Sequence, residues 1–394
     1  MTAEILIMNK HAIALAADSV VTVNEEITYE GVNKLFMLSN DPPMGIMIYG
    51  SAEFMGIPME TLIKEYKKTA NFQEKNSVDT IVEDFLKFLE TSFKKYIEPT
   101  FTFENPTFED FNEIISNEIE TDFDSFYEGI WDINYHISDK LLTSFKESGF
   151  FDNDEATFKE LSEKLPYDDK GVIIDLLKKR CIGGLTSTGI VVAGFNSEDI
   201  FPSFSENEIY FVFNNKLIFN KVQEVLNING SLIRPFAQRD VVDNFLFGMD
   251  LNIINSLKNF LKATLDNYEN SILDVVASNN KIKLNKINQI KEDIKQVTEN
   301  NDEILESFDE LINKIIEQYT TPILGAIDAL PKDELGNMCE SLIHITSLKR
   351  KVSGGLPTVG GDIDVAIISK GDGFVWMKRK HYFDVKFNPH FLKK

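Results

Sequence analysis

The chain has 394 residues, a formal net charge of −23 and a hydrophobic content of 43%. This composition is typical of a soluble globular protein with a full core, and the length allows two or three domains or one domain with large insertions. The strong negative charge argues against nucleic acid or an anionic membrane as the main partner.

The cysteines and histidines do not form a recognisable metal or disulfide pattern. Cys181 and Cys339 are far apart and in no CxxC motif, which suits a reducing cytosol, and the five histidines have no metal-binding spacing. We therefore expect neither a metal nor a cofactor. Residues 9–11 interrupt the first apolar stretch, so we expect no signal peptide, no membrane span and a cytoplasmic location.

The first 70 residues predict strands followed by a helix. Residues 5–8 and 12–21 are almost continuously apolar, which predicts two strands covered on both faces, with a hairpin turn at 9–11. Residues 45–49 predict another strand, and residues 52–68 predict an amphipathic helix.

The middle of the chain changes from helical to strand patterns. Residues from about 70 to 180 are mostly helical in pattern, with a clear helix over 78–96. Residues 189–195 and 209–213 predict strands, and residues 231–235 predict a strand or a turn.

The next part predicts long helices. Residues 241–268 form one helical pattern, and residues 278–318 carry Lys, Asn, Glu and Ile at spacings of three and four. That second pattern predicts a helical hairpin or a coiled-coil arm, punctuated by Pro322 and Pro331. We interpret the arm as a solvated helix pair, with an oligomer or partner contact as the alternative. Residues 334–349 predict a further helix.

Two strands, at residues 363–369 and 374–378, close the pattern. Strands, helices, strands, helices and strands follow one another along the chain. This order predicts an α+β fold in which a central pair of sheets is flanked by helices and carries two helical insertions.

Three residues near the start of the chain have the chemistry of an activated nucleophile. Thr2 follows Met1, Asp18 lies sixteen residues later, and Lys34 lies sixteen residues after Asp18. A small second residue normally lets an aminopeptidase remove Met1, so Thr2 would carry both a hydroxyl and a free α-amine. Such an amine titrates near about 7.7–8.0 in model peptides, which is close to the pH at which a general base works best.

The other residues have supporting roles in this hypothesis. Lys34 would stabilise the developing alkoxide, and Asp18 would orient Lys34 and keep it charged. The backbone N–H of Gly50 would contribute to an oxyanion hole. Taken singly, Asp18 is more simply explained as a residue that ends a strand, Lys34 as a surface lysine and Gly50 as a turn residue. Only their joint spacing favours a catalytic role.

These residues resemble a known family. The segments Thr2-Ala3-Glu4-Ile5 and Ala16-Ala17-Asp18-Ser19, followed by Lys34 and Gly50, resemble the start of proteasome β-type subunits and HslV-type peptidases. Those proteins are N-terminal nucleophile (Ntn) hydrolases. The resemblance implies a four-layer αββα sandwich in which Thr2, Asp18, Lys34 and Gly50 form the catalytic core.

Later segments extend the resemblance to roughly half of the chain. Residues 190–195, 240–250 and 360–373 resemble a central strand, the helix after it and the last strand pair of the family. The resemblance implies one Ntn-hydrolase-like domain over residues 1–394. Its core would cover approximately residues 1–69, 181–254 and 336–383, with helical insertions at approximately 70–180 and 255–335.

The sequence departs from the family at the residues that assist the threonine amine. Leu356 and Val359 stand where the family has an Asp and a Ser, and residues 236–240 lack the family's Gly-Ser-Gly turn. Four other residues could substitute for the missing groups. They are Asp240, Ser353, Thr358 and Asp362.

The resemblance implies a threonine peptidase that cleaves peptide bonds through an acyl-enzyme ester. It also implies peptide or unfolded-protein substrates, a homo-oligomer and an ATP-dependent unfoldase as a partner. Two alternatives stay open: an Ntn amidohydrolase acting on a small amide, and an inactive proteasome-like scaffold or regulatory subunit.

Overall fold

The computed structural model describes most of the chain. The described residues are 3–23, 27–96, 137–152, 154–165, 169–227, 229–278, 284–353, 358–381 and 383–388. Thr2 and residues 97–136 lie outside them.

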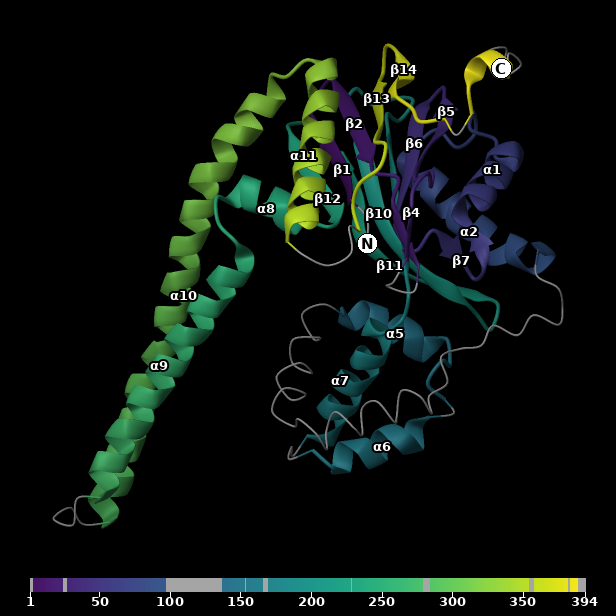
Figure 1. The fold of residues 1–394 in the computed structure, drawn as a ribbon. Helices are drawn as coiled ribbons and strands as arrows, with labels where there is room; N and C mark the ends of the chain where they lie inside the picture. Colours follow the sequence, from purple (N-terminus) through teal and green to yellow (C-terminus); the bar gives the residue numbers. More distant parts are fainter. Residues whose placement is uncertain are drawn as a thin grey trace.

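Two five-stranded antiparallel sheets form the centre of the molecule (Figure 1). Sheet I contains, in spatial order, β12 (Leu232–Ala237), β1 (Ala3–Met8), β2 (Ala12–Ala17), β13 (Asp364–Ser369) and β14 (Gly373–Lys378). Sheet II contains β11 (Lys216–Asn227), β10 (Ser203–Phe213), β9 (Thr188–Gly194), β6 (Pro43–Gly50) and β5 (Leu35–Asn40).

The central strands are apolar on both sides because both of their faces are covered. Leu6 and Leu15 of sheet I pack between the sheets with Met47 and Val191 of sheet II. The alternate positions of sheet I, such as Ile7, face the helices instead. Successive side chains of a strand point to opposite faces, so a continuous apolar run fits a strand buried on both sides.

Helices cover the outer face of each sheet. On sheet I they are α8 (Asp240–Phe247), α11 (Lys332–Val352) and the end of α10 (Leu284–Asp328). On sheet II they are α1 (Met59–Thr69) and α2 (Val78–Tyr96). The result is a four-layer αββα sandwich, and the predicted fold class is confirmed.

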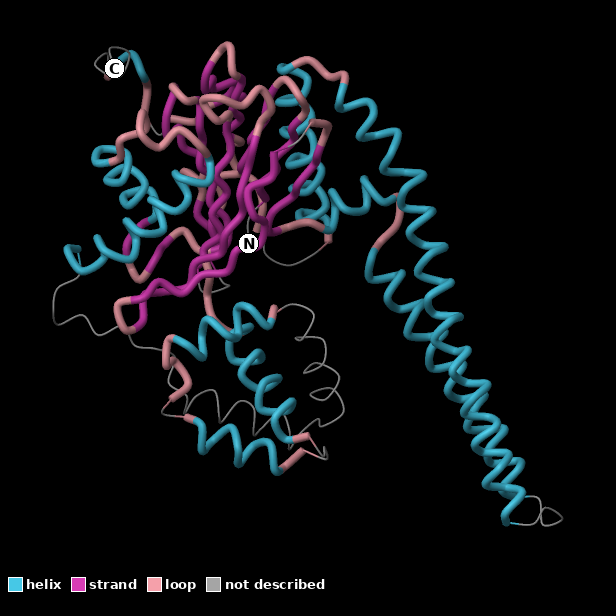
Figure 2. The backbone as a smooth tube through the Cα atoms, turned by 180° about the vertical axis from the view of Figure 1, so that it is seen from behind, coloured by secondary structure: helices cyan, strands magenta, loops and turns pink. Residues whose placement is uncertain are grey.

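A long helical arm extends from the sandwich (Figures 1 and 2). It consists of α9 (Leu251–Ser278) and α10, and an ion pair of 2.6 Å between Lys258 Nζ and Asp309 Oδ2 joins the two helices. Residues 284–318 thus belong to one helix of an arm, and the prediction of a hairpin within residues 278–318 is wrong, because the second helix of the pair is α9. The expectation that Pro322 punctuates the arm is wrong, because α10 continues through this proline to Asp328.

A separate group of helices packs against the β10–β11 hairpin. It contains α5 (Asp139–Glu147), α6 (Glu155–Glu163) and α7 (Lys170–Gly183). Phe145 and Phe151 lie at the centre of its apolar cluster, which also includes Phe211 of β10 and Ile218 of β11. Within residues 137–183, the helical prediction is confirmed.

Two predicted elements have different bounds in the structure. The helix predicted over 241–268 is divided, because Gly248 adopts a left-handed conformation (φ 73°) that ends α8. The helix predicted over 52–68 begins only at Met59, after the short strands β7 (Glu53–Phe54) and β8 (Ile57–Pro58).

Other strands differ from the sequence prediction. The strand predicted over 12–21 ends at Ala17, and a small hairpin of β3 (Val21–Val23) and β4 (Ile27–Tyr29) follows. Strands β5 and β11 were not predicted. β11 is an edge strand that pairs with β10 through several register shifts, so its polar and apolar residues do not alternate regularly. A short 3₁₀ helix, η1 (Val385–Phe387), lies near the C-terminus.

Within those described ranges, no helix has the length and apolar character that crossing a membrane requires.

Candidate active site

Three buried charged residues meet at one end of the space between the sheets. Glu4 lies in β1, Asp18 directly follows β2, and Lys34 directly precedes β5. The side chains of Glu4 and Asp18 are completely buried, and that of Lys34 is 3% exposed. Buried charges of this kind persist in a folded protein only when they are paired.

Lys34 is the centre of this cluster. Its Nζ donates hydrogen bonds to Asp18 Oδ1 at 2.5 Å and to the carbonyl oxygen of Val20 at 2.6 Å. Glu4 Oε1 lies 3.5 Å from the same nitrogen. Two carboxylates therefore neutralise one ammonium, and two of its three N–H donors point at defined acceptors.

Asp18 connects Lys34 to two other parts of the chain. Its Oδ1 accepts a hydrogen bond from the backbone N–H of Ala3 at 3.2 Å, and its Oδ2 accepts one from Gly360 N–H at 2.9 Å. The N–H of Asp18 in turn donates to the carbonyl oxygen of Ala3 at 3.1 Å. The residue that follows Thr2 is thus held on the Asp18–Lys34 pair.

Glu4 was not identified from the sequence as part of the site. It stands opposite Ala17 of β2 and Phe236 of β12 in sheet I. Its neighbours in β1 are all apolar and buried. An acidic residue inside a strand that is covered on both faces was a signal in the sequence, because an unpaired buried carboxylate is costly.

A second ion cluster lies on the other side of Ala17. Asp364 of β13 stands opposite Ala17, and its Oδ2 accepts hydrogen bonds from Lys380 Nζ at 2.6 Å and Arg379 NH1 at 2.7 Å. Burial lowers the pKa of Lys380; Asp364 opposes this shift, and the charges of Arg379 and Lys34 add to it. The two clusters are therefore close enough for Lys380 to respond to the charge of Lys34.

Gly50 ends β6, at the same end of sheet II as Lys34. The N–H of Ile48, two residues earlier, donates to the carbonyl oxygen of Lys34 at 2.9 Å. The following residue, Ser51, donates its N–H to the carbonyl oxygen of Ser187 at 3.1 Å. Gly50 is exposed, which leaves its backbone accessible to a ligand.

The loop before β13 crosses over the residues that follow β2. Besides the Gly360–Asp18 contact, the N–H of Ser19 donates to the carbonyl oxygen of Gly360 at 3.3 Å. Gly361 has a φ of +70°, and a Cβ at this position would overlap Ser19 Oγ. Only glycine fits this crossing without strain.

Two hydroxyl groups near this crossing are buried without a hydrogen-bond partner among the described residues. They are Ser19 Oγ and Thr358 Oγ1. Thr358 stands two residues before Gly360, the residue whose N–H binds Asp18. Buried hydroxyls normally have a partner, so these two are available to bind a further polar group.

The remaining residues considered for the amine have other surroundings. Asp240 accepts hydrogen bonds from Lys349 and Arg350, and Ser353 Oγ donates to the carbonyl oxygen of Lys349. Val359 belongs to the core beside sheet I, and Asp362 is exposed. Leu356 lies outside the described residues.

A third polar group lies between the sheets on the β12 side. Tyr49 Oη donates to Glu206 Oε1 at 2.8 Å, and the ring of Tyr49 stacks on Phe236 at a centroid distance of 5.5 Å. Arg234 binds the other oxygen of Glu206 at 2.7 Å. Burial, together with the charge of Glu206, raises the pKa of Tyr49 far above its usual value, so Tyr49 acts here as a neutral hydrogen-bond donor.

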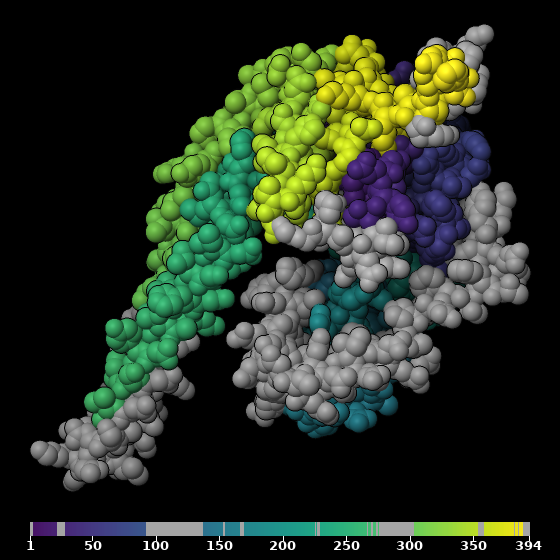
Figure 3. Space-filling view, in the orientation of Figure 1, coloured from purple at the N-terminus to yellow at the C-terminus, as the bar shows by residue number. Residues whose placement is uncertain are grey.

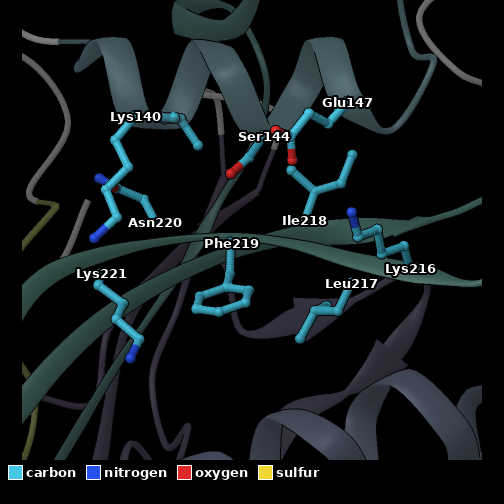
Figure 4. A pocket seen from close by; sticks show the side chains of 10 residues that line it. Lys140, Ser144, Glu147, Lys216, Leu217, Ile218, Phe219, Asn220 and Lys221 are labelled. Atoms are coloured by element: carbon cyan, nitrogen blue, oxygen red, sulfur yellow. The ribbon is translucent and has the colours of Figure 1, made fainter.

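Two of the hollows on the surface are lined by described residues. One of about 460 Å³ borders the second ion cluster, with Gly361, Arg379 and Lys380 among its lining residues. The other, of about 320 Å³, lies between Lys140, Ser144 and Glu147 of α5 and residues 216–221 of β11 (Figure 4). The second hollow shares no residue with the cluster around Lys34, so we assign it no part in the chemistry.

Among the described residues, no group of three or more His, Cys, Asp or Glu side chains could hold a metal ion.

Comparisons with known proteins give similarities to solved structures alone. No family model matches the sequence, and no curated protein matches it. The structure is similar to that of "Anbu (ancestral beta-subunit) from Yersinia bercovieri", with 7% sequence identity, coverage of 99% of this chain and 93% of that chain, and a TM-score of 0.31. At this TM-score the similarity supports neither a fold nor a function for this chain. The fold assignment rests on the two sheets and their helical layers.

The geometry defines what the site can do chemically. An ammonium group held by Asp18 and backed by Glu4 is a fixed positive charge in a water-poor space, where it stabilises a developing oxyanion more strongly than in water. Asp18 also ties this charge to Ala3, the residue after Thr2. The structure thus brings Asp18 and Lys34 together, places Gly50 at the same end of sheet II, and does not describe Thr2.

Proposed function

We propose that this protein is an N-terminal threonine hydrolase that cleaves peptide bonds. The observation that carries the proposal is the buried Asp18–Lys34 pair, which binds the backbone of Ala3 directly. The αββα sandwich and the sequence resemblance to proteasome β-type subunits support it. The proposal requires removal of Met1, so that Thr2 carries a free α-amine.

In the proposed reaction the hydroxyl of Thr2 attacks the substrate carbonyl carbon. Its proton passes to the Thr2 α-amine, and the Lys34 ammonium stabilises the alkoxide. The Gly50 N–H donates to the oxyanion of the tetrahedral intermediate. The amine then protonates the departing amide nitrogen, and an ester forms between Thr2 and the acyl part of the substrate. Water hydrolyses that ester with the amine again acting as the base.

The α-amine needs hydrogen-bond partners that keep it oriented. Ser19 and Thr358 have buried hydroxyls with no partner among the described residues, and Thr358 is two residues from the Gly360 contact with Asp18. We propose that Thr358 takes the role that Leu356 and Val359 cannot perform, with Ser19 beside it. Both hydroxyls can donate or accept, as the two protonation states of an amine require.

The resemblance also suggests how such an enzyme would operate. We propose that it self-associates in the cytoplasm and receives unfolded polypeptides from an ATP-dependent unfoldase. A small amide substrate is the alternative for the same nucleophile.

The proposal is tested by measuring the intact mass of the purified protein before and after treatment with a β-lactone or epoxyketone probe. We expect the mass to show loss of Met1 and the addition of one probe molecule per chain. Peptide mapping should place the probe on Thr2, and a fluorogenic peptide should be hydrolysed at the same time.

Thr2→Ala is the direct control, because alanine also permits removal of Met1 and lacks the hydroxyl. We expect it to abolish both labelling and hydrolysis. Retention of Met1, or hydrolysis that Thr2→Ala does not reduce, would contradict the proposal. Absence of labelling in a protein with a free Thr2 would instead favour the inactive scaffold.

A further inference from the structure

The helical arm has an apolar surface that is exposed to solvent in the part of the chain that the structure describes. Nine large apolar side chains along α9 and α10 are each between 43% and 72% exposed. On α9 they are Ile253, Leu257, Phe260, Tyr268, Ile272 and Val275, and on α10 they are Ile304, Leu311 and Tyr319. We call these nine residues the arm stripe.

The spacing of the arm stripe follows the helical repeat. Its members on α9 recur every three or four residues except across residue 264, and those on α10 recur every seven or eight. Such spacing places side chains on one side of an α-helix. Each helix therefore has two apolar surfaces, one that faces its partner in the arm and one that is exposed.

The exposed surfaces of the two helices lie on the same face of the arm. On α9, exposed Ile253 immediately precedes buried Ile254. On α10, exposed Ile304 and Leu311 likewise immediately precede the less exposed Leu305 and Ile312. In both helices, the exposed apolar side chains thus come one residue before the side chains that face the other helix. They are therefore turned about the helix axis by the same angle and in the same direction from the contact between the helices. Because the helices are antiparallel, equal rotation brings both stripes to one face.

The opposite face of the arm is polar. Exposed residues there include Asn259 and Lys262 on α9 and Glu310 and Asn313 on α10. The arm stripe itself contains no charged residue. The net charge of −23 opposes binding of the protein to anionic lipid.

We propose that the arm stripe is the contact surface for the arm of a second copy of this chain. Two arms packed face to face form a four-helix bundle, in which each helix contacts two neighbours. Each helix therefore needs a second apolar surface beside the one that faces its partner in the same arm. An uncharged apolar face is complementary to itself, which suits the two-fold symmetry of a homodimeric contact.

The exposed area is sufficient for a stable contact. At roughly 100 Å² for each of nine half-exposed large side chains, one arm presents roughly 900 Å², so that two arms would bury about 1,800 Å², within the standard range for specific interfaces. The arm also stands away from the sandwich along much of its length (Figure 3).

The mass of the full-length protein in solution tests this inference. We expect the wild type to have a mass that is an even multiple of 44.9 kDa, measured by light scattering after size-exclusion chromatography. The double variant Phe260→Glu with Leu311→Glu places one carboxylate from each helix in the apolar contact. We expect it to reduce the mass to half of the wild-type value.

The matched control adds the same two charges to the polar face. The double variant Asn259→Glu with Asn313→Glu should keep the wild-type mass, and circular dichroism should show equal helix content in all three proteins. A wild type that is monomeric, or a Phe260→Glu/Leu311→Glu variant with the wild-type mass and helix content, would overturn the inference. The test does not depend on whether Thr2 reacts.

Discussion

Lys34 is the residue on which the buried charges of the candidate site converge. Its ammonium lies 2.5 Å from Asp18 Oδ1 and 3.5 Å from Glu4 Oε1, and water reaches little of it. Removing one ion from such a cluster lowers the free energy of unfolding more than replacing the whole cluster with apolar residues, because the remaining charges stay buried without a partner. The proposed catalysis and the stability of the fold therefore depend on the same side chain.

Lys34→Met should remove labelling of Thr2 by the β-lactone probe and lower the free energy of unfolding by about 3–5 kcal/mol, because Asp18 and Glu4 lose their counter-charge. Urea unfolding and intact mass measure the two effects. The double variant Lys34→Met with Asp18→Asn should regain part of the stability and none of the labelling. Full stability of the single variant would show that the buried carboxylates are neutralised by another group.

Thr358 gives a second prediction at this scale. Thr358→Ala should slow labelling of Thr2 by roughly tenfold, which corresponds to the loss of about one hydrogen bond, whereas Thr358→Ser should retain the rate. Ser353→Ala is the matched control, since Ser353 Oγ is bound to the carbonyl oxygen of Lys349 in α11. An equal effect of the two alanine variants would exclude a specific role for Thr358.

At the scale of elements, an ion cluster joins α8 and α11, two of the helices that cover sheet I. Asp240, the first residue of α8, accepts hydrogen bonds from Lys349 Nζ at 2.9 Å and from Arg350 NH2 at 3.2 Å, both at the end of α11. Burial alone would raise the pKa of Asp240, but Lys349 and Arg350 outweigh it and hold the pKa below its usual value. The carboxylate thus stabilises the fold in its ionised form.

This cluster makes a prediction about pH. Because the pKa of Asp240 is lower in the folded state, its contribution is complete above the unfolded-state pKa of about 3.9 and is lost as the pH falls through the folded value. Asp240→Asn should cost about 1 kcal/mol at pH 7, as expected of a partly exposed cluster.

The difference between Asp240→Asn and the wild type in urea unfolding should shrink as the pH falls below 4. A difference that stays constant between pH 7 and pH 3 would contradict this assignment. Asp175→Asn, which removes an exposed ion pair with Lys146 in the α5–α7 group, is a control outside the α8–α11 contact.

Some helices and strands could be predicted from sequence patterns alone, and others could not. Helix α2 has the bounds that its apolar spacing predicts, because one face packs on sheet II and the other is solvated. The divided helix at Gly248 was missed because glycine is tolerated inside helices, and only the packing beside Tyr319 shows that this one ends α8. Edge strand β11 was missed because its pairing partner, and not its own pattern, defines it.

At the scale of the whole molecule, the sandwich and the arm are joined at a small root. Ile254 of α9 and Ile327 of α10 are buried there, and Thr320 Oγ1 donates to the carbonyl oxygen of Leu246 at 3.1 Å. Beyond this root the arm contributes no residue to the three apolar clusters around the sheets. Its outer part should therefore be separable from the stability of the sandwich.

Replacing residues 263–304 with a short Gly-Ser turn should leave the thermal unfolding midpoint of the sandwich and the rate of Thr2 labelling unchanged, because the root contacts remain. The same change should halve the mass of the oligomer, since it removes four of the nine arm-stripe residues and the outer part of the proposed contact. Light scattering, calorimetry and intact mass measure the three results. A lower midpoint would show that the outer arm stabilises the sandwich.

The sequence by itself determined the two-sheet architecture and the helical arm, and it led to the proposed relation among Thr2, Asp18 and Lys34, since strand periodicity, helical spacing and residue chemistry are local properties. Only the tertiary structure decided which groups surround Lys34. Glu4 lies far along the chain from Gly360 and Asp364, and the pairing of β1, β2 and β13 brings all three to the same end of sheet I. Because these groups are buried, the fold is stable only when their ion pairs and hydrogen bonds form, since a carboxylate or ammonium removed from water must have a partner.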